Sequence, residues 1–162
     1  YQIAGCDDKK NAELMQALKS EGVYESTDAM KAGLKDFAAG YATEAQTAET
    51  IHDVYKKTGY VMDTHTAVAA HVCQEYQENS GDKTKCVVAS TASPYKFAGS
   101  VMAAIDEKYA SVDEFDLLKE LSQVSNTEMP NAIKEILNAN ILHTLEGEVD
   151  KMEDTVMAIL EL

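Results

Sequence analysis

Residues 86–97 read CVVASTASPYKF, and this stretch decides how the rest of the chain is interpreted. A short apolar run leads into two adjacent hydroxyls, Ser90 and Thr91. Ser93 and Pro94 then supply a helix N-cap residue and a proline at the first helical position. A buried strand, a polar tip and a helix N-terminus in this order place small hydrogen-bond donors where α/β proteins bind ligands.

The expected fold class is α/β and helix-rich, with one buried strand at about residues 85–91 flanked by helices. The run is too short for a helix and is bounded by turn residues, which favours a strand. A lone buried strand cannot satisfy its own backbone hydrogen bonds. Either weaker strands such as residues 141–145 complete the sheet, or the sheet lies partly outside this chain.

Elsewhere apolar residues recur at helical spacing, and several residues mark the expected helix ends. Thr43 with Gln46, and Ser111 with Glu114, match the capping-box pattern. Asp63 or Thr64 is expected to cap the helix that follows. The glycines expected just beyond helix C-termini are Gly22 and Gly59.

Length and charge limit the classes of function. The 162 residues suit one domain or a piece of a larger one, and the first residues, YQIAG, look cut rather than natural. A net charge of −14 argues against nucleic acid and anionic membranes as partners. No apolar stretch has the length of a membrane span and no secretion signal is recognised.

The three cysteines are odd in number and lack paired spacing. Cys73 lies in a helical pattern and Cys86 in the apolar run, so both are expected to be reduced and packed. Reduced, unpaired cysteines are typical of cytoplasmic proteins, so we expect a cytoplasmic protein. His65, His71 and Cys73 do not have the i, i+4 spacing of ligands on one helix face, so no metal site is expected.

Ser90 and Thr91 are the leading candidates for ligand contact. A hydroxyl can hydrogen-bond a heteroaromatic nitrogen without adding charge, which suits the pyridine nitrogen of pyridoxal phosphate. The alternative is that both hydroxyls satisfy backbone groups at a strand end.

Residues 63–67, DTHTA, form a second polar cluster before an apolar helix. Asp63 and His65 would give an anion-facing helix N-terminus with an imidazole beside it, or an elaborate helix cap. Lys96 would face a phosphate, or be a solvated charge on an exposed helix.

Three stretches together resemble the C-terminal third of threonine synthase. They are FAAG at 37–40, TGYVMDTHTAV at 58–68 and STASPYKF at 90–97. The family usually reads G-Y-x-x-D-P-H-T-A-V and S-T-A-H-P-x-K-F, so Thr64 replaces a proline here and Ser93 a histidine. The resemblance spans nearly all of this chain but only about the last third of the enzyme.

The resemblance implies a pyridoxal-phosphate lyase of fold type II, the tryptophan-synthase-β type, in threonine biosynthesis. Such an enzyme converts O-phosphohomoserine and water to L-threonine and phosphate by β,γ-replacement. By similarity, Thr91 with Ser90 beside it approaches the pyridine nitrogen of the cofactor. Asp63, His65 and Lys96 would belong to the active-site wall or contact phosphate.

No segment here matches the family's Schiff-base lysine or its glycine-rich phosphate loop, which lie earlier in the enzyme. Residues 1–162 are therefore expected to be a single C-terminal fragment that forms one wall of the site. Alone, it is expected to bind no cofactor and to be inactive; its partner would be the missing N-terminal part. Apolar surface exposed by truncation is expected to favour a dimer. The alternative is a non-enzymatic helical interaction module.

Overall fold

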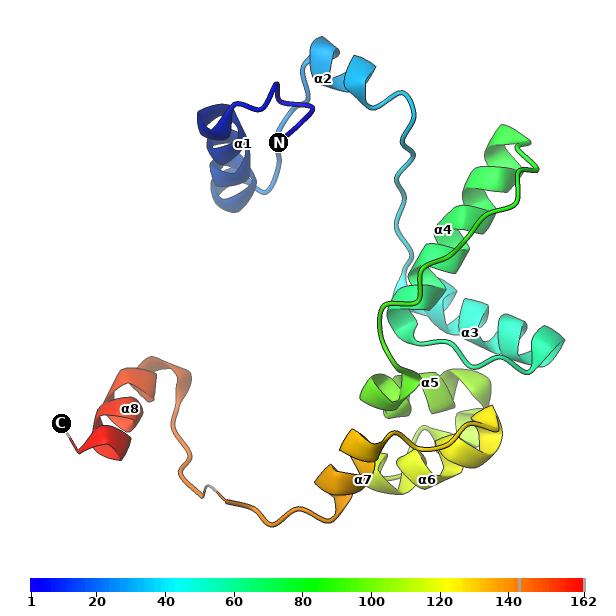
Figure 1. Ribbon diagram of the computed structural model, residues 1–162, viewed down its shortest axis with the longest axis vertical. Coiled ribbons are helices and arrows are strands. Elements are labelled where there is room, and N and C mark those ends of the chain that lie inside the picture. The colour runs from blue at the N-terminus through cyan, green and yellow to red at the C-terminus, as the bar shows by residue number, and fades with distance from the viewer. Residues whose placement is uncertain (143, 162) are drawn as a thin grey trace.

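The computed structural model describes residues 1–142 and 144–161, and its elements are helical (Figure 1). The α-helices are α1 (Asp8–Glu21), α2 (Asp28–Gly33), α3 (Glu44–Thr58), α4 (Thr64–Ser80), α5 (Ala98–Ile105), α6 (Glu114–Ser125), α7 (Asn131–Leu137) and α8 (Met152–Leu160). The described residues also form the 3-10 turns η1 (Pro94–Phe97), η2 (Glu107–Tyr109) and η3 (Val149–Lys151).

The core lies among α3, α4, α5 and α6. Helix α3 packs against α4 and α5, and α5 packs against α6. Helix α5 is central because it contacts both neighbours and carries small and medium apolar residues. The buried members of the core are Ile51, Val61, Met62, Ala67, Tyr95, Ala98, Val101, Met102, Leu117, Leu118 and Leu121.

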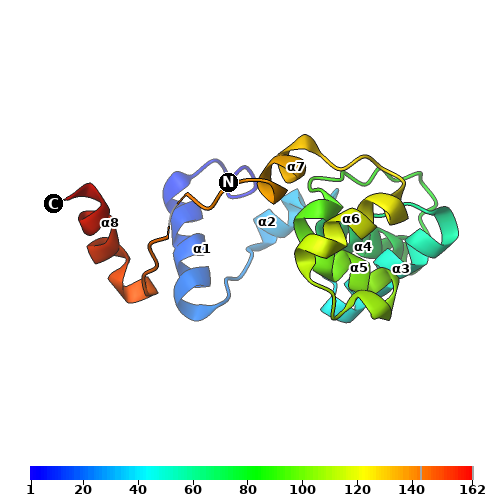
Figure 2. The same ribbon diagram turned by 90° about the horizontal axis from the view of Figure 1, so that it is seen from below.

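The two ends of the chain lie away from this core, as Figures 1 and 2 both show. Helices α1 and α2 each bury one apolar residue, Leu14 and Met30 respectively. At the other end, η3 and α8 leave a set of large apolar side chains exposed. They are Val149, Met152, Val156, Met157, Ile159 and Leu160.

Most helix ends follow the sequence signals. Thr43 and Gln46 form the expected capping box of α3. Gly22 and Gly59 end α1 and α3 with φ of 75°, a left-handed conformation that glycine adopts without strain. The capping box expected at Ser111 is wrong, because the side chain of Asp113 accepts the hydrogen bond that caps α6.

The α/β class and the buried strand at 85–91 are wrong. Within the described residues there is no strand, and 85–91 runs as irregular, exposed chain. Val87 is 93% exposed and Val88 is 37% exposed. Valine favours strands because it fits a pleated, half-buried surface, and the described residues offer no neighbouring strand to provide one.

The second candidate strand, 141–145, is wrong in its described part as well. Ile141, Leu142 and Leu145 are exposed and lie outside regular secondary structure. Residue 143 lies outside the described residues. Across the described part of the chain, no helix combines the length and apolarity needed to cross a membrane.

Leucine truncations test the position of the core. Leu121 is 0% exposed, so L121A is expected to lower the free energy of unfolding by about 2–5 kcal/mol. Leu142 is 82% exposed, so the matched variant L142A is expected to change it by less than about 0.5 kcal/mol. Urea unfolding measures both, and equal losses would contradict the core described above.

Candidate functional site

The first part of the site is the N-terminus of α4, which Asp63 caps. Its carboxylate Oδ1 accepts the backbone N–H of His65 at 2.9 Å and of Thr66 at 3.2 Å. These two donors have no partner within the helix, and a carboxylate before the first turn satisfies them. Asp63 is 0% exposed, so this cap is part of the protein interior.

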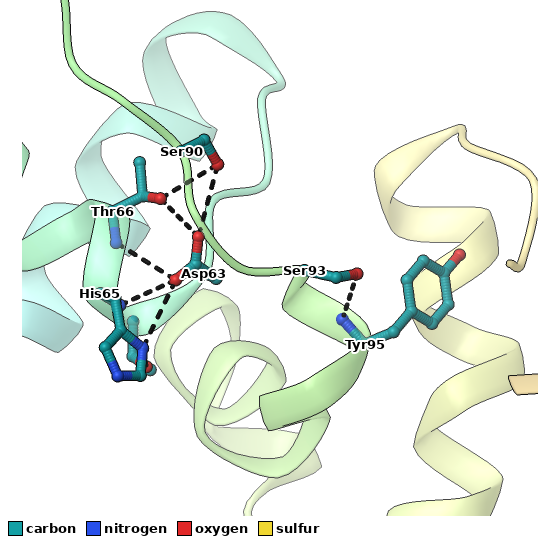
Figure 3. Close-up of polar contacts among 7 residues, drawn as sticks. Asp63, His65, Thr66, Ser90, Ser93 and Tyr95 are labelled. Carbon is teal, nitrogen blue, oxygen red and sulfur yellow. Dashed lines mark hydrogen bonds and ion pairs between the residues drawn. The ribbon is translucent and has the colours of Figure 1, made fainter. Parts of the chain in front are cut away.

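A hydroxyl network joins this cap to the segment that carries Ser90 (Figure 3). The Thr66 hydroxyl donates to Asp63 Oδ2. Thr66 Oγ1 also lies 3.0 Å from Ser90 Oγ, and the Ser90 hydroxyl donates to Asp63 Oδ2 at 3.5 Å. Residues that are 24 to 27 positions apart in sequence thus meet at one buried carboxylate.

The network keeps Asp63 ionised. Burial by itself raises the pKa of this carboxyl, because it penalises the charged form. The hydrogen bonds from the Thr66 hydroxyl and from the two backbone N–H groups outweigh burial, and the pKa of Asp63 lies below its ordinary value. His65 adds to this effect, with Nδ1 at 3.6 Å from Asp63 Oδ1.

Two cationic or titratable side chains gather around the Phe97 ring. The His65 ring packs against it, with 5.0 Å between centroids and a tilt of 42°. Lys96 Nζ lies 5.7 Å from the centroid of the same ring. Both His65 and Lys96 are exposed, so they form a polar rim beside the capped helix.

The structure brings His65 and Ser90 each into contact with Asp63, and places Lys96 near His65 through the Phe97 ring. Thr91 follows Ser90 and is exposed, without joining the Asp63 network. The residue that sequence analysis left out is Thr66, which bridges Asp63 and Ser90. Its signal was its position: a side chain three residues after the N-cap can reach back to that cap.

Both departures from the family motifs lie at the start of a helical element. Ser93 caps η1, where its hydroxyl accepts the backbone N–H of Tyr95 at 3.3 Å. The Tyr95 hydroxyl donates to the Thr127 carbonyl at 3.3 Å. Thr64 is the first residue of α4, where proline is favoured but not required.

The polar groups that lie around the start of α4 and η1 are hydroxyls, an imidazole and an ammonium. Within the described residues, no group of three or more His, Cys, Asp or Glu side chains is arranged to hold a metal ion. The hydroxyls of Thr66 and Ser90 lie next to the Asp63 carboxylate, which already accepts several hydrogen bonds. Neutral hydroxyls in such a position can bind and orient a polar ligand.

Comparison with known proteins identifies the family. Residues 66–155, more than half of the chain, match the family described as "Threonine synthase, C-terminal". This match includes Thr66, Ser90, Thr91 and Lys96, and begins just after Asp63 and His65.

Individual relatives agree. Threonine synthase-like 1 of Homo sapiens is 29% identical over 165 residues, which cover 98% of this chain and 20% of that protein. Threonine synthase of Corynebacterium glutamicum is 30% identical over 111 residues, covering 67% of this chain and 22% of that protein. Threonine synthase of Pseudomonas aeruginosa is 30% identical over 105 residues, which cover 64% of this chain and 22% of that protein. The chain spans about a fifth of the length of these curated relatives.

The buried cap gives stability a specific pH dependence. The pKa of Asp63 is lower in the folded state than in the unfolded state, so its contribution is present at neutral pH. That contribution is lost as the pH falls below about 4, through the ordinary carboxyl range toward the lowered folded-state value. D63N is expected to cost about 1–3 kcal/mol of unfolding free energy at neutral pH, a difference that shrinks toward zero in acid.

Urea unfolding of the wild type and D63N from neutral to acidic pH measures this difference. The matched control is D113N, at the exposed cap of α6, where asparagine caps as well as aspartate. It is expected to change stability by less than about 0.5 kcal/mol. A D63N effect that stays constant with pH would contradict the assignment.

Proposed function

Since this chain belongs to the threonine synthase family, in which it matches the C-terminal part, we propose that it forms one wall of the active site of a larger enzyme. That enzyme would convert O-phosphohomoserine and water to L-threonine and phosphate. The observation that carries the proposal is the joining of the two family motifs, DTHTA at 63–67 and STASPYKF at 90–97, through the Asp63–Thr66–Ser90 network.

The residues present fit pyridoxal phosphate as the cofactor of the whole enzyme. The Asp63 carboxylate is buried and already accepts several hydrogen bonds, so it is not available to pair with a protonated pyridine nitrogen. Thr91 is exposed and offers a neutral hydroxyl, with Ser90 holding the segment beside it. Thr91, and Ser90 after it, would contact the ring nitrogen. When bound, the cofactor would supply an electron sink for the reaction.

Lys96 and His65 would contact the substrate phosphate. All fourteen basic residues are lysines, so no arginine provides a bidentate phosphate contact from this chain. The net charge of −14 repels anions overall, which leaves phosphate binding to local cations. Around Phe97, Lys96 and His65 supply an ammonium and an imidazole on one exposed rim.

The rest of the enzyme would be the main partner of this chain. Exposed apolar side chains at 87–88, at 141–142 and along α8 offer surface for it to cover. The same α8 surface is what a non-enzymatic helical interaction module would use. The two proposals differ in one respect: the enzyme requires a cofactor-binding region with its lysine upstream of Tyr1 in the same reading frame. The gene sequence upstream of Tyr1 distinguishes them.

The 162-residue chain alone is expected to release no phosphate from O-phosphohomoserine in the presence of pyridoxal phosphate. The reason is that no segment here matches the family's cofactor-bearing lysine or phosphate loop. A phosphate-release assay checks this, with an active threonine synthase as the positive control. Sustained turnover by the chain alone would contradict the proposal.

In the enzyme that carries this chain, T91V is expected to lower kcat/KM by about tenfold and to weaken cofactor binding. The change removes one hydrogen bond of about 1 kcal/mol or more while keeping side-chain volume. Steady-state kinetics and cofactor titration measure the two effects. The control S100A removes an exposed hydroxyl on α5 and is expected to leave both unchanged. Unaltered kinetics and affinity in T91V would exclude Thr91 as a cofactor contact.

A further inference from the structure

The segment that follows α4 runs back along it, as Figure 1 shows. Two sets of side-chain contacts hold it there. Near one end, Thr66 Oγ1 lies 3.0 Å from Ser90 Oγ. Near the other, Gln77 Nε2 donates to the Thr84 carbonyl at 2.8 Å and to Cys86 Sγ at 3.4 Å.

These contacts define a register between helix and segment. From Thr66 to Gln77 the helix rises about 16 Å, and five residues of extended chain cover about the same length. Residues 85–90 therefore run antiparallel to α4 as a fully extended chain. Cys73 is one helical turn before Gln77, on the same face, and falls opposite Cys86.

This register makes the two thiols neighbours, because Gln77, one turn from Cys73, reaches Cys86 Sγ. The Cys73 thiol raises the pKa of the Cys86 thiol, with a smaller contribution from burial and from the Asp82 charge. Cys86 is exposed and Cys73 is half-buried, which corrects the expectation that both are packed in the interior. A small oxidant in solution can reach Cys86.

We propose that Cys73 and Cys86 form a reversible disulfide that fastens the segment 84–91 to α4. The oxidant is a small disulfide such as oxidised glutathione. The thiolate of one cysteine attacks a glutathione sulfur, forming a mixed disulfide and releasing one glutathione thiol. The second cysteine then attacks the protein sulfur of that mixed disulfide and releases the second glutathione. Both cysteines are oxidised, one small disulfide is reduced to two thiols, and the thiol protons pass to the released glutathione.

The cross-link would act on the segment that carries Ser90 and Thr91. In the reduced chain, side-chain contacts from Thr66 and Gln77 hold this segment. In the oxidised chain, a covalent bond four residues before Ser90 would restrict it further. The disulfide forms whether or not the chain takes part in threonine synthesis, so its test is independent of the proposed function.

Peptide mapping tests the proposal directly. The 162-residue chain, at about 10 μM, is incubated with oxidised glutathione at about pH 8, where the thiolate fraction is larger. Free thiols are then alkylated and the chain is cut with trypsin. We expect peptide 58–83, which holds Cys73, to be linked to peptide 86–96, which holds Cys86. Dithiothreitol should reverse the linkage.

Cys6, in peptide 1–9, is the internal control, because it lies before α1 and far in sequence from both Cys73 and Cys86. An effective concentration in the millimolar range should favour the 73–86 link by about a hundredfold over any link between molecules. In C73S, Cys86 should instead carry a glutathione adduct, and in C6S the 73–86 link should persist. Separate glutathione adducts on Cys73 and Cys86 in the wild type, or links to Cys6 of equal abundance, would overturn the proposal.

Discussion

The carboxylate of Asp63 is the point on which the arrangement of the site depends. It is buried, and it could not remain charged there without the donors that surround it. Two of those donors begin α4, one is the Thr66 hydroxyl, and one comes from Ser90 on a distant segment. The same group therefore starts a core helix and places the hydroxyl-bearing segment beside it.

The contacts of Asp63 explain how Ser90 is held in position without a β-sheet. In an α/β protein, a ladder of backbone hydrogen bonds would set the position of Ser90 and Thr91. Here side chains on α4 do so, from Thr66 near one end and from Gln77 near the other. The two cysteines lie between these attachment points, which is why oxidation there would bear on the same segment.

Sequence alone predicted the local features well. Helix caps depend on nearest neighbours, so Thr43 with Gln46 and the glycines after α1 and α3 could be placed from the pattern. The pattern left the cap of α4 open between Asp63 and Thr64, and the structure shows Asp63 there. The strand at 85–91 failed because a strand needs partners, and the described residues contain none. Valine content carries no information about whether those partners are present.

The role of Thr66 could not be predicted for a related reason. Its position three residues after the cap allows it to reach Asp63, but the contact with Ser90 depends on how the later segment runs back along α4. The exposure of Cys86 follows from the same course of the chain. Long-range contacts of this kind depend on tertiary packing, which periodicity does not encode.

The exposed pair at 87–88 also has a consequence for solubility. An extended, apolar run with open edges is a template for edge-to-edge association between chains. Lys83 and Lys85 precede the run and Pro94 follows it. Charged residues and proline in such flanking positions act as gatekeepers against aggregation. While Val87 and Val88 remain uncovered, these three residues disfavour association between copies of the chain at this run.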